Sequence, residues 1–233
     1  EHPTPIPGDP SRAMASMGIY IFNAKFLYEQ LIRDADDPNS EHDFGKDIIP
    51  YLVSRYRVFA HRFSESCVGV QNGAIYWRDV GTVEAYWEAN MELAKITPDL
   101  NLYDDKWPIW TYQEQLPPAK FVFDDEARRG MAVDSMVSGG CIISGAIVRR
   151  SVLFSNVRVN TYSEVTDSVI LPNVDIGRYA HLNRVVVDKG CRIPDGLEVG
   201  CDSAKDAERF YVTEKGVTLI TPEMLGQYIH HVR

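Results

Sequence analysis

The decapeptide SVILPNVDIG, residues 168–177, is one of four aligned blocks in the second half of the chain. The others are SMVSGGCIIS (135–144), SVLFSNVRVN (151–160) and VVVDKGCRIP (185–194). They begin 16, 17 and 17 residues apart, so they form an internal repeat. A unit this short cannot bury its own apolar face and must stack on its neighbours. The repeat therefore predicts a solenoid of about 17-residue coils, best matched by a β-helix with three short strands per coil.

The columns of the aligned blocks predict which residues turn the chain and which point inward. The sixth column contains glycine or asparagine, the residue types that most readily accept a positive φ at a tight corner. Its members are Gly140, Asn156, Asn173 and Gly190. The seventh and ninth columns are apolar, and alternate residues of a strand face the same side. These two columns should form the interior, and Arg158 of the eighth column should project outward.

The composition limits the class of protein. The chain has 233 residues, of which 45% are hydrophobic and 24% charged, as expected for one or two globular domains. A net charge of -9 argues against a general nucleic-acid binder, since affinity for phosphate backbones needs clustered Lys and Arg. No apolar run approaches the length needed to cross a bilayer, so we expect no membrane partner.

The cysteines predict the compartment. Cys67, Cys141, Cys191 and Cys201 lack Cys-x-x-Cys spacing and a nearby histidine pattern of the zinc type. We expect reduced, mostly buried thiols, which are typical of a cytoplasmic location.

The first ninety or so residues alternate between strand-like and helix-like segments. Residues 16–22 are predicted to form a strand, and Asn23 to cap a helix over 24–33. Helical spacing recurs over 43–56, and Thr82 is a suitable N-cap for a helix that runs to about residue 95. Such alternation indicates part of an α/β sheet domain.

The boundaries follow from composition. The proline-rich segment 97–118 is predicted to link an N-terminal part, 1–96, to the β-helix, 119–233. Near the end of the chain, residues 222–229 are a candidate capping helix.

Two carboxylates are candidates for chemistry, and each has a purely structural alternative. Asp79 in YWRDVGT (76–82) could bind a metal or could support the turn before Thr82, and spacing alone favours the turn. One carboxylate does not make a metal site, because Mg²⁺ usually takes one or two carboxylates plus substrate phosphates. Asp43 could line a site or cap the following helix, and the cap is favoured. His181 is expected to be an exposed coil residue rather than a general base.

Five motifs, taken together and in order, carry a specific resemblance to a known family. They are ASMGIYIF (15–22), HDFGKDIIP (42–50), YWRDVGTVEAYWEAN (76–90), PPAKFV (117–122) and VSGGCIISG (137–145). With them the chain resembles the C-terminal portion of bacterial ADP-glucose pyrophosphorylases, the glucose-1-phosphate adenylyltransferases. The resemblance implies an α/β plus all-β fold, in which the C-terminal part of a Rossmann-like nucleotidyltransferase domain precedes a left-handed β-helix.

The resemblance also implies a reaction and a site. The phosphate of glucose 1-phosphate would attack the α-phosphorus of ATP, giving ADP-glucose and pyrophosphate, with Mg²⁺ as cofactor. The residues implied for the sugar-phosphate pocket are Ser16, Tyr20, Asp43, Phe44 and Trp77. Asp79 would be the catalytic Mg²⁺ ligand, together with a second aspartate from a preceding half of the protein.

Further expectations concern what lies outside the chain and how it is regulated. The family's glycine-rich nucleotide loop, second aspartate and Glu-Lys-Pro motif would precede residue 1, so this chain alone is expected to be inactive. The family implies a homotetramer regulated by allosteric metabolites, and Arg158 matches an arginine of the effector region. Pro222 and Gly226 stand where enteric members carry arginines, which implies a weaker response to fructose 1,6-bisphosphate.

Two alternatives remain open. One is another sugar-nucleotide pyrophosphorylase with a β-helix tail, such as one that also acetylates, for which His181 is the available histidine. The other is a non-catalytic regulatory or oligomerisation subunit, which predicts that site residues are lost. Ser16, Asp43, Trp77 and Asp79 all match the family, and this favours part of an active enzyme.

Overall fold

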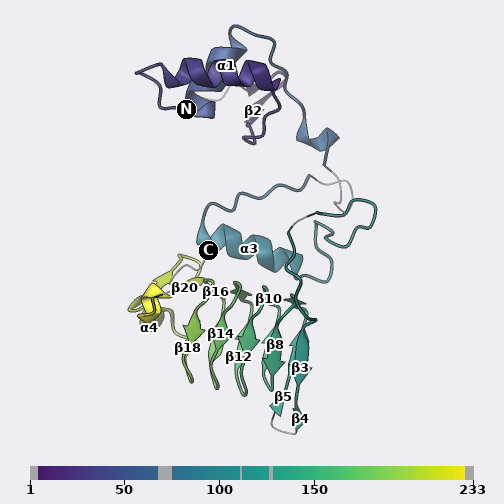
Figure 1. Cartoon of the computed structure of the whole chain (residues 1–233), viewed down its shortest axis with the longest axis vertical. Coiled ribbons are helices and arrows are strands. Elements are labelled where there is room, and N and C mark those ends of the chain that lie inside the picture. The colour runs from purple at the N-terminus through teal and green to yellow at the C-terminus, as the bar shows by residue number, and fades with distance from the viewer. Residues whose placement is uncertain (1–4, 68–74, 111, 126–127, 229–233) are drawn as a thin grey trace. The chain divides into compact units, whose positions relative to one another are not determined.

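The chain forms two compact units (Figure 1). A computed structural model describes residues 5–67, 75–110, 112–125 and 128–228. Unit 1 is Glu1–Arg62 and unit 2 is Phe63–Arg233. The predicted domain divisions 1–96, 97–118 and 119–233 stay predictions.

Unit 1 contains a short hairpin and two helical segments. The hairpin joins β1 (Pro5–Ile6) to the antiparallel β2 (Asp9–Ala13). Helix α1 (Ala24–Ala35) begins at Asn23, whose side chain accepts a hydrogen bond from the Phe26 amide, as predicted. A π-helical turn, η1 (Phe44–Ile48), continues into α2 (Ile49–Val53), so helical structure within 43–56 is also confirmed.

The strand predicted at residues 16–22 is wrong. This segment contains no strand in the described chain. A strand exists only where a neighbour completes its hydrogen-bond ladder, and the described residues supply no such neighbour here. Its apolar side chains are correspondingly uncovered, with Ile19 75% and Ile21 99% exposed.

Unit 2 is dominated by a parallel β-helix, as the repeat predicts. Each coil contributes one strand to each of three sheets, and partners in successive coils pair in parallel register. The first sheet runs β7 (Met136–Val137), β10 (Val152–Leu153), β13 (Val169–Ile170), β16 (Val185–Val187), β20 (Thr218–Ile220), with β19 (Tyr211–Val212) antiparallel at its end. The second runs β3 (Lys120–Val122), β8 (Ile142–Ser144), β11 (Arg158–Val159), β14 (Asp175–Ile176), β17 (Arg192–Ile193). The third runs β6 (Met131–Val133), β9 (Ile147–Arg149), β12 (Glu164–Thr166), β15 (His181–Asn183), β18 (Glu198–Val199). Strands β4 (Asp124–Asp125) and β5 (Arg128–Arg129) form a separate antiparallel pair.

The coils turn at three columns of residues with positive φ. The predicted column is confirmed, with φ of 75° at Gly140, 60° at Asn156, 63° at Asn173 and 72° at Gly190. Two further columns were not predicted. They are Gly145, Tyr162, Tyr179 and Gly196, and Asp134, Arg150, Asp167 and Arg184, with φ from 44° to 70°. Each coil is therefore a triangle whose three sides are the three sheets.

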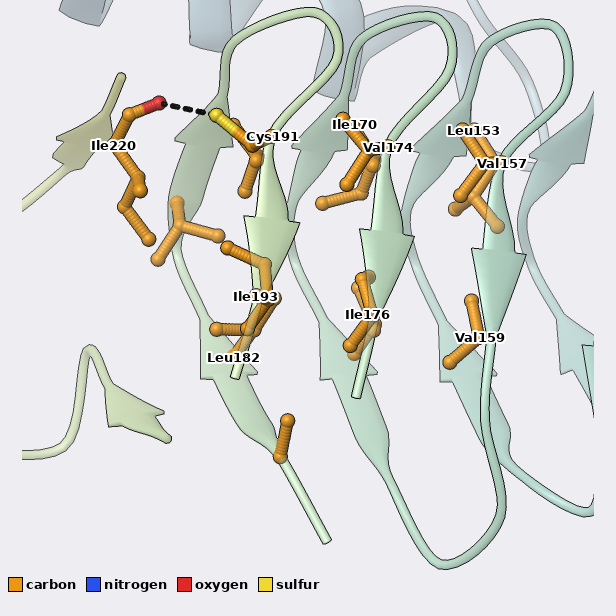
Figure 2. Close-up of a cluster of buried hydrophobic side chains, with 14 of the residues drawn as sticks. Leu153, Val157, Val159, Ile170, Val174, Ile176, Leu182, Cys191, Ile193 and Ile220 are labelled. Atoms are coloured by element: carbon orange, nitrogen blue, oxygen red, sulfur yellow. Dashed lines mark hydrogen bonds between the residues drawn. The ribbon is translucent and has the colours of Figure 1, made fainter. Parts of the chain in front are cut away.

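The interior of the β-helix is a stack of apolar rows (Figure 2). The predicted seventh and ninth columns are buried in every coil, including Val157, Val174 and Cys191 in one row and Val159, Ile176 and Ile193 in the other. Burial, with Asp188 and Glu223 nearby, raises the pKa of the Cys191 thiol to about 12, so this thiol is unreactive at neutral pH. Cys141 is also buried, whereas Cys201 is exposed; all four cysteines are free.

The C-terminal end of the β-helix is covered by short elements. They are α4 (Ser203–Ala207), β19 and a short 3₁₀ turn, η4 (Glu223–Leu225). The candidate capping helix over 222–229 is wrong in length, because Gly226 adopts φ 69° and ends the turn; residue 229 lies outside the described residues.

Helix α3 (Val83–Leu93) lies across the coils of the β-helix (Figure 1). Thr82 caps it as predicted, accepting a hydrogen bond from the Ala85 amide at 3.1 Å. Its apolar face packs on a cluster distinct from the main core. The helix contributes Val83, Tyr86, Trp87 and Met91, and the β-helix contributes Val169, Val186 and Val217 with neighbours. A short 3₁₀ turn, η2 (Phe63–Glu65), precedes α3, and the described residues of 97–118 contain no helix or multi-residue strand.

Candidate active site

Unit 1 contains an open pocket of about 750 Å³. Its walls come from the segment 16–22, from the loop before η1, from the start of η1 and from one residue of α1. They are Ser16, Gly18, Tyr20, Phe22, Leu27, His42, Asp43, Phe44 and Gly45. Four residues singled out from the sequence therefore lie together: Ser16, Tyr20, Asp43 and Phe44.

Three aromatic rings form one wall of this pocket. Tyr20 and Phe44 are stacked, with centroids 5.8 Å apart and planes at 17°. Phe22 is tilted against both, at 6.3 Å from Tyr20 and 6.2 Å from Phe44. Such a wall offers a flat apolar surface to a ligand, beside a few polar groups that can orient it.

The polar groups come from both segments. Ser16 Oγ lies 3.1 Å from the Tyr20 hydroxyl and accepts a hydrogen bond from the Gly18 amide at 3.2 Å. Asp43 Oδ1 accepts hydrogen bonds from the amides of Gly45 at 2.7 Å and Lys46 at 2.8 Å. The helix-capping interpretation of Asp43 is confirmed, and the same carboxylate also lines the pocket.

A second group of side chains, which the sequence did not reveal, fixes the loop that carries Asp43. The buried Asp34 of α1 contacts His42 Nδ1 at 3.0 Å and accepts a hydrogen bond from Ser40 Oγ at 2.8 Å. The His42 contact is the main reason that the pKa of Asp34 lies below its ordinary value. These bonds hold His42 at φ 59°, a left-handed conformation at the start of the loop. The sequence did not predict that Asp34 holds this loop, because an aspartate on a helix has no characteristic pattern for such a role.

The remaining two candidates belong to unit 2. Asp79 Oδ1 accepts a hydrogen bond from the Gly81 amide at 2.9 Å, so Asp79 supports the turn before Thr82, as spacing alone favoured. Trp77 is 50% exposed. Between them, the Arg78 guanidinium lies over the Tyr76 ring and contacts Glu92 at 3.2 Å and Asp99 at 3.1 Å. The contacts of Arg78 therefore fix the backbone between Trp77 and Asp79.

Asp79 could contribute one carboxylate ligand to a metal ion. Among the described residues, no group of three or more His, Cys, Asp or Glu side chains is arranged to hold a metal ion. Mg²⁺ commonly takes one or two carboxylates and completes its shell with phosphates and water. One carboxylate on a capped turn is compatible with that pattern.

The other sequence candidates lie on the β-helix. Arg158 is exposed on β11, as predicted, between Ile142 and Asp175 of the adjacent coils. His181 is exposed on β15, which agrees with the simpler interpretation. Within the described residues, no helix is long and apolar enough to cross a membrane.

Comparison with protein families matches the two halves of the chain separately. A family described as "Nucleotidyl transferase" matches residues 6–96, and one described as "GlmU-like, C-terminal hexapeptide" matches residues 117–220. The predicted fold class, part of a nucleotidyltransferase domain followed by a β-helix, is confirmed. A glucose-1-phosphate adenylyltransferase of Methylobacillus flagellatus is 70% identical over 232 residues, which are 100% of this chain and 54% of that protein. The chain resembles glucose-1-phosphate adenylyltransferases from end to end.

Other adenylyltransferases give the same result. The one from Nitrosospira multiformis is 72% identical over 231 residues, covering 99% of this chain and 54% of that protein. The one from Nitrosomonas europaea is 69% identical over 234 residues, covering 100% of this chain and 54% of that protein. The chain spans about half the length of the adenylyltransferases it matches.

Proposed function

We propose that the protein represented by this chain transfers the adenylyl group of ATP to glucose 1-phosphate, releasing pyrophosphate and forming ADP-glucose for α-glucan synthesis. The observation that carries the proposal is the pocket of unit 1, in which Ser16, Tyr20, Asp43 and Phe44 converge from two separate motifs. The name and high identity of the adenylyltransferase relatives support the same reaction.

The pocket has the chemistry that a sugar needs. The stacked rings of Tyr20 and Phe44 offer an apolar surface to the C–H face of a pyranose. The hydroxyls of Ser16 and Tyr20 can exchange hydrogen bonds with sugar hydroxyls. Asp43 Oδ1 is engaged by two backbone amides, which leaves Oδ2 to accept a charge-assisted hydrogen bond from a ligand hydroxyl. Trp77, which the family resemblance assigns to sugar-phosphate binding, is half exposed on its own loop.

Asp79 would act as one ligand of Mg²⁺, and the other ligands would be substrate phosphates and a second carboxylate outside this chain. When bound, the metal would neutralise the charge that develops on the phosphates during transfer. The Asp79 side chain is held by the Gly81 amide, so its carboxylate is oriented before any metal arrives.

The same proposal covers assembly and regulation. Arg158 would bind an anionic effector, because its guanidinium is exposed on a rigid strand of the β-helix. The protein would work in the cytoplasm as a homotetramer controlled by metabolites.

The test is an assay of the full-length gene product with glucose 1-phosphate and either ATP or UTP, alongside the variant Asp79→Asn. We expect ADP-glucose formation with a preference for ATP. Loss of a true Mg²⁺ ligand should cost several kcal/mol of transition-state stabilisation, on the order of 100-fold in kcat/KM or more. The matched control is Asp105→Asn, at an exposed aspartate of the segment that follows α3, which should leave the rate unchanged.

The other outcomes point elsewhere. A rate for Asp79→Asn within about twofold of wild type would exclude the metal role. A preference for UTP would favour another β-helix-tailed pyrophosphorylase. A full-length protein that produces no sugar nucleotide would favour the non-catalytic subunit.

A further inference from the structure

Helix α3 joins the loop that carries Asp79 to the side of the β-helix. We propose that Trp87 of this helix is a positioning residue: its indole anchors α3 on the β-helix, and α3 in turn holds Asp79 in its metal-binding place. This inference rests on the proposed function for the role of Asp79, but the anchoring itself can be measured without turnover.

The anchor is a directed polar contact inside an apolar cluster. Trp87 Nε1 donates a hydrogen bond to the backbone carbonyl of Asp167 at 2.7 Å. Asp167 occupies a corner of its coil at φ 48°, and its carboxylate binds the guanidinium of Arg150, the equivalent corner of the preceding coil, at 2.7 and 2.8 Å. On the other side, the guanidinium of Arg184, the corner of the next coil, lies 4.7 Å from the centre of the Trp87 ring. One side chain of α3 therefore contacts two successive corners of the β-helix.

Two further contacts fix the direction of the helix. The apolar face of α3 packs on Val169, Val186 and Val217, and this burial holds the helix against the coils. Lys215, in the turn between β19 and β20, contacts Glu84 at 2.7 Å and Glu88 at 3.1 Å on α3. A single hydrogen bond would allow α3 to pivot, whereas contacts along its length fix it.

The turn that carries Asp79 is connected to α3 at two points. Asp79 lies three residues before Thr82, the N-cap of α3, and its carboxylate binds the Gly81 amide between them. Arg78 adds a second connection, because its guanidinium contacts Glu92 in the last turn of α3. The turn is therefore tied to both ends of α3, and α3 is tied to the β-helix.

The consequence is that the β-helix is part of the active-site scaffold and not only an appended domain. A carboxylate that binds a metal must be held within fractions of an ångström of its productive position. The turn that carries Asp79 is short and exposed, so it cannot fix the carboxylate by its own packing. The contact of Trp87 with the β-helix holds α3, and α3 holds the turn. Trp87 would touch neither substrate nor metal.

The test uses the full-length protein with Trp87→Phe, which keeps an aromatic ring and removes the N–H donor. The first readout is hydrogen exchange at the Gly81 amide, which reports on its bond to Asp79 without any catalysis. We expect exchange to accelerate by about two- to tenfold, the range set by loss of one hydrogen bond. The second readout is Mn²⁺ binding, followed by electron paramagnetic resonance in the presence of a non-hydrolysable ATP analogue. We expect affinity for Mn²⁺ to fall by a similar factor, while KM for glucose 1-phosphate stays within about twofold of wild type.

A second variant and a control keep the test decisive. Glu92→Gln weakens the Arg78 contact without entering the apolar cluster, so it should accelerate Gly81 exchange even if Trp87→Phe fails to fold. Met91→Leu changes the same packed face at nearly constant volume and should leave Gly81 exchange and Mn²⁺ affinity unaltered.

The proposal is overturned if a folded Trp87→Phe leaves Gly81 exchange and Mn²⁺ affinity at wild-type values, if Glu92→Gln leaves them there where Trp87→Phe does not fold, or if Met91→Leu changes them equally. An inactive wild-type protein would overturn the proposed function instead, and Gly81 exchange would still decide whether Trp87 anchors the turn.

Discussion

The two units bury their apolar side chains to very different extents. In the described part of unit 1 the buried apolar residues are Ile48 and Leu52, whereas every coil of the β-helix contributes fully buried side chains to one continuous core. The difference follows from sequence distance. A coil packs on a coil about 17 residues away, so a solenoid finds its partners nearby in the chain. Unit 1 has no such repeat, and the sheet among its described residues is the hairpin β1–β2, which leaves apolar side chains such as Ile21 uncovered.

This contrast also describes the candidate site. The pocket of unit 1 is shaped by local bonds, such as the Asp43 cap and the contact between Asp34 and His42. The Asp79 turn depends instead on α3 and, through it, on the β-helix. The pocket of unit 1 is organised by its own loops, whereas the Asp79 turn is organised by its attachment to the β-helix within unit 2.

The largest effect is expected from truncating the β-helix core. Ile176→Ala removes a fully buried side chain in the middle of the stack and should lower the free energy of unfolding of the 233-residue chain by about 2–5 kcal/mol. The matched change Ile21→Ala affects a side chain that is 99% exposed and should cost less than about 0.5 kcal/mol. Urea unfolding of both variants measures the difference. Equal losses would mean that unit 1 has a core comparable to that of the β-helix.

A smaller effect is expected at the corners of the coils. Asn173 adopts φ 63° and accepts a hydrogen bond from Asn156 Nδ2 at 3.3 Å. Asn173→Ala should lose about 1–2 kcal/mol, because alanine pays the steric cost of the left-handed conformation. Asn173→Gly accepts this conformation freely and should lose clearly less. If both variants unfold at the same urea concentration, backbone conformation is not what selects asparagine there.

The smallest effect should appear in unit 1 as a pH dependence. His42 is the main cause of the lowered pKa of Asp34, so the folded pKa lies below the unfolded value of 3.8. Asp34 therefore adds stability above its ordinary pKa, and this contribution disappears as the pH falls through the folded pKa. The difference in stability between wild type and Asp34→Asn should be constant near neutral pH and shrink below about pH 4. Thermal unfolding from pH 7 to pH 3 measures it, and a difference that grows on acidification would reverse the assigned sign.

The β-helix could be predicted from the sequence because every coil repeats the same pattern of apolar residues and corner residues. The apolar columns and the corner at Gly140, Asn156, Asn173 and Gly190 follow from residue type alone. The other two corners could not be predicted in this way, because most coils place there residues such as Tyr162, Tyr179 and Arg150, which carry no general preference for positive φ. The strand predicted at 16–22 was wrong because strand formation depends on a partner that a local pattern does not contain.

For the site, local rules predicted the caps at Asn23, Asp43 and Thr82, which depend only on neighbouring amides. The meeting of Ser16 and Tyr20 with Asp43 and Phe44 was implied only by family resemblance, since no spacing rule joins segments about 25 residues apart. The supporting contacts of Asp34 and Trp87 needed the structure, because an aspartate or a tryptophan on a helix has many possible partners.

The most direct test of the account is the effect of Asp43→Asn on glucose 1-phosphate binding by the full-length protein. Asparagine is as good an N-cap as aspartate, so the fold should survive while the charge facing the pocket is lost. Loss of a charge-assisted hydrogen bond to the sugar should raise KM for glucose 1-phosphate roughly tenfold or more, with the melting temperature nearly unchanged. A KM within about twofold of wild type would show that Asp43 is only a helix cap, and would contradict the assignment of this pocket to the sugar phosphate.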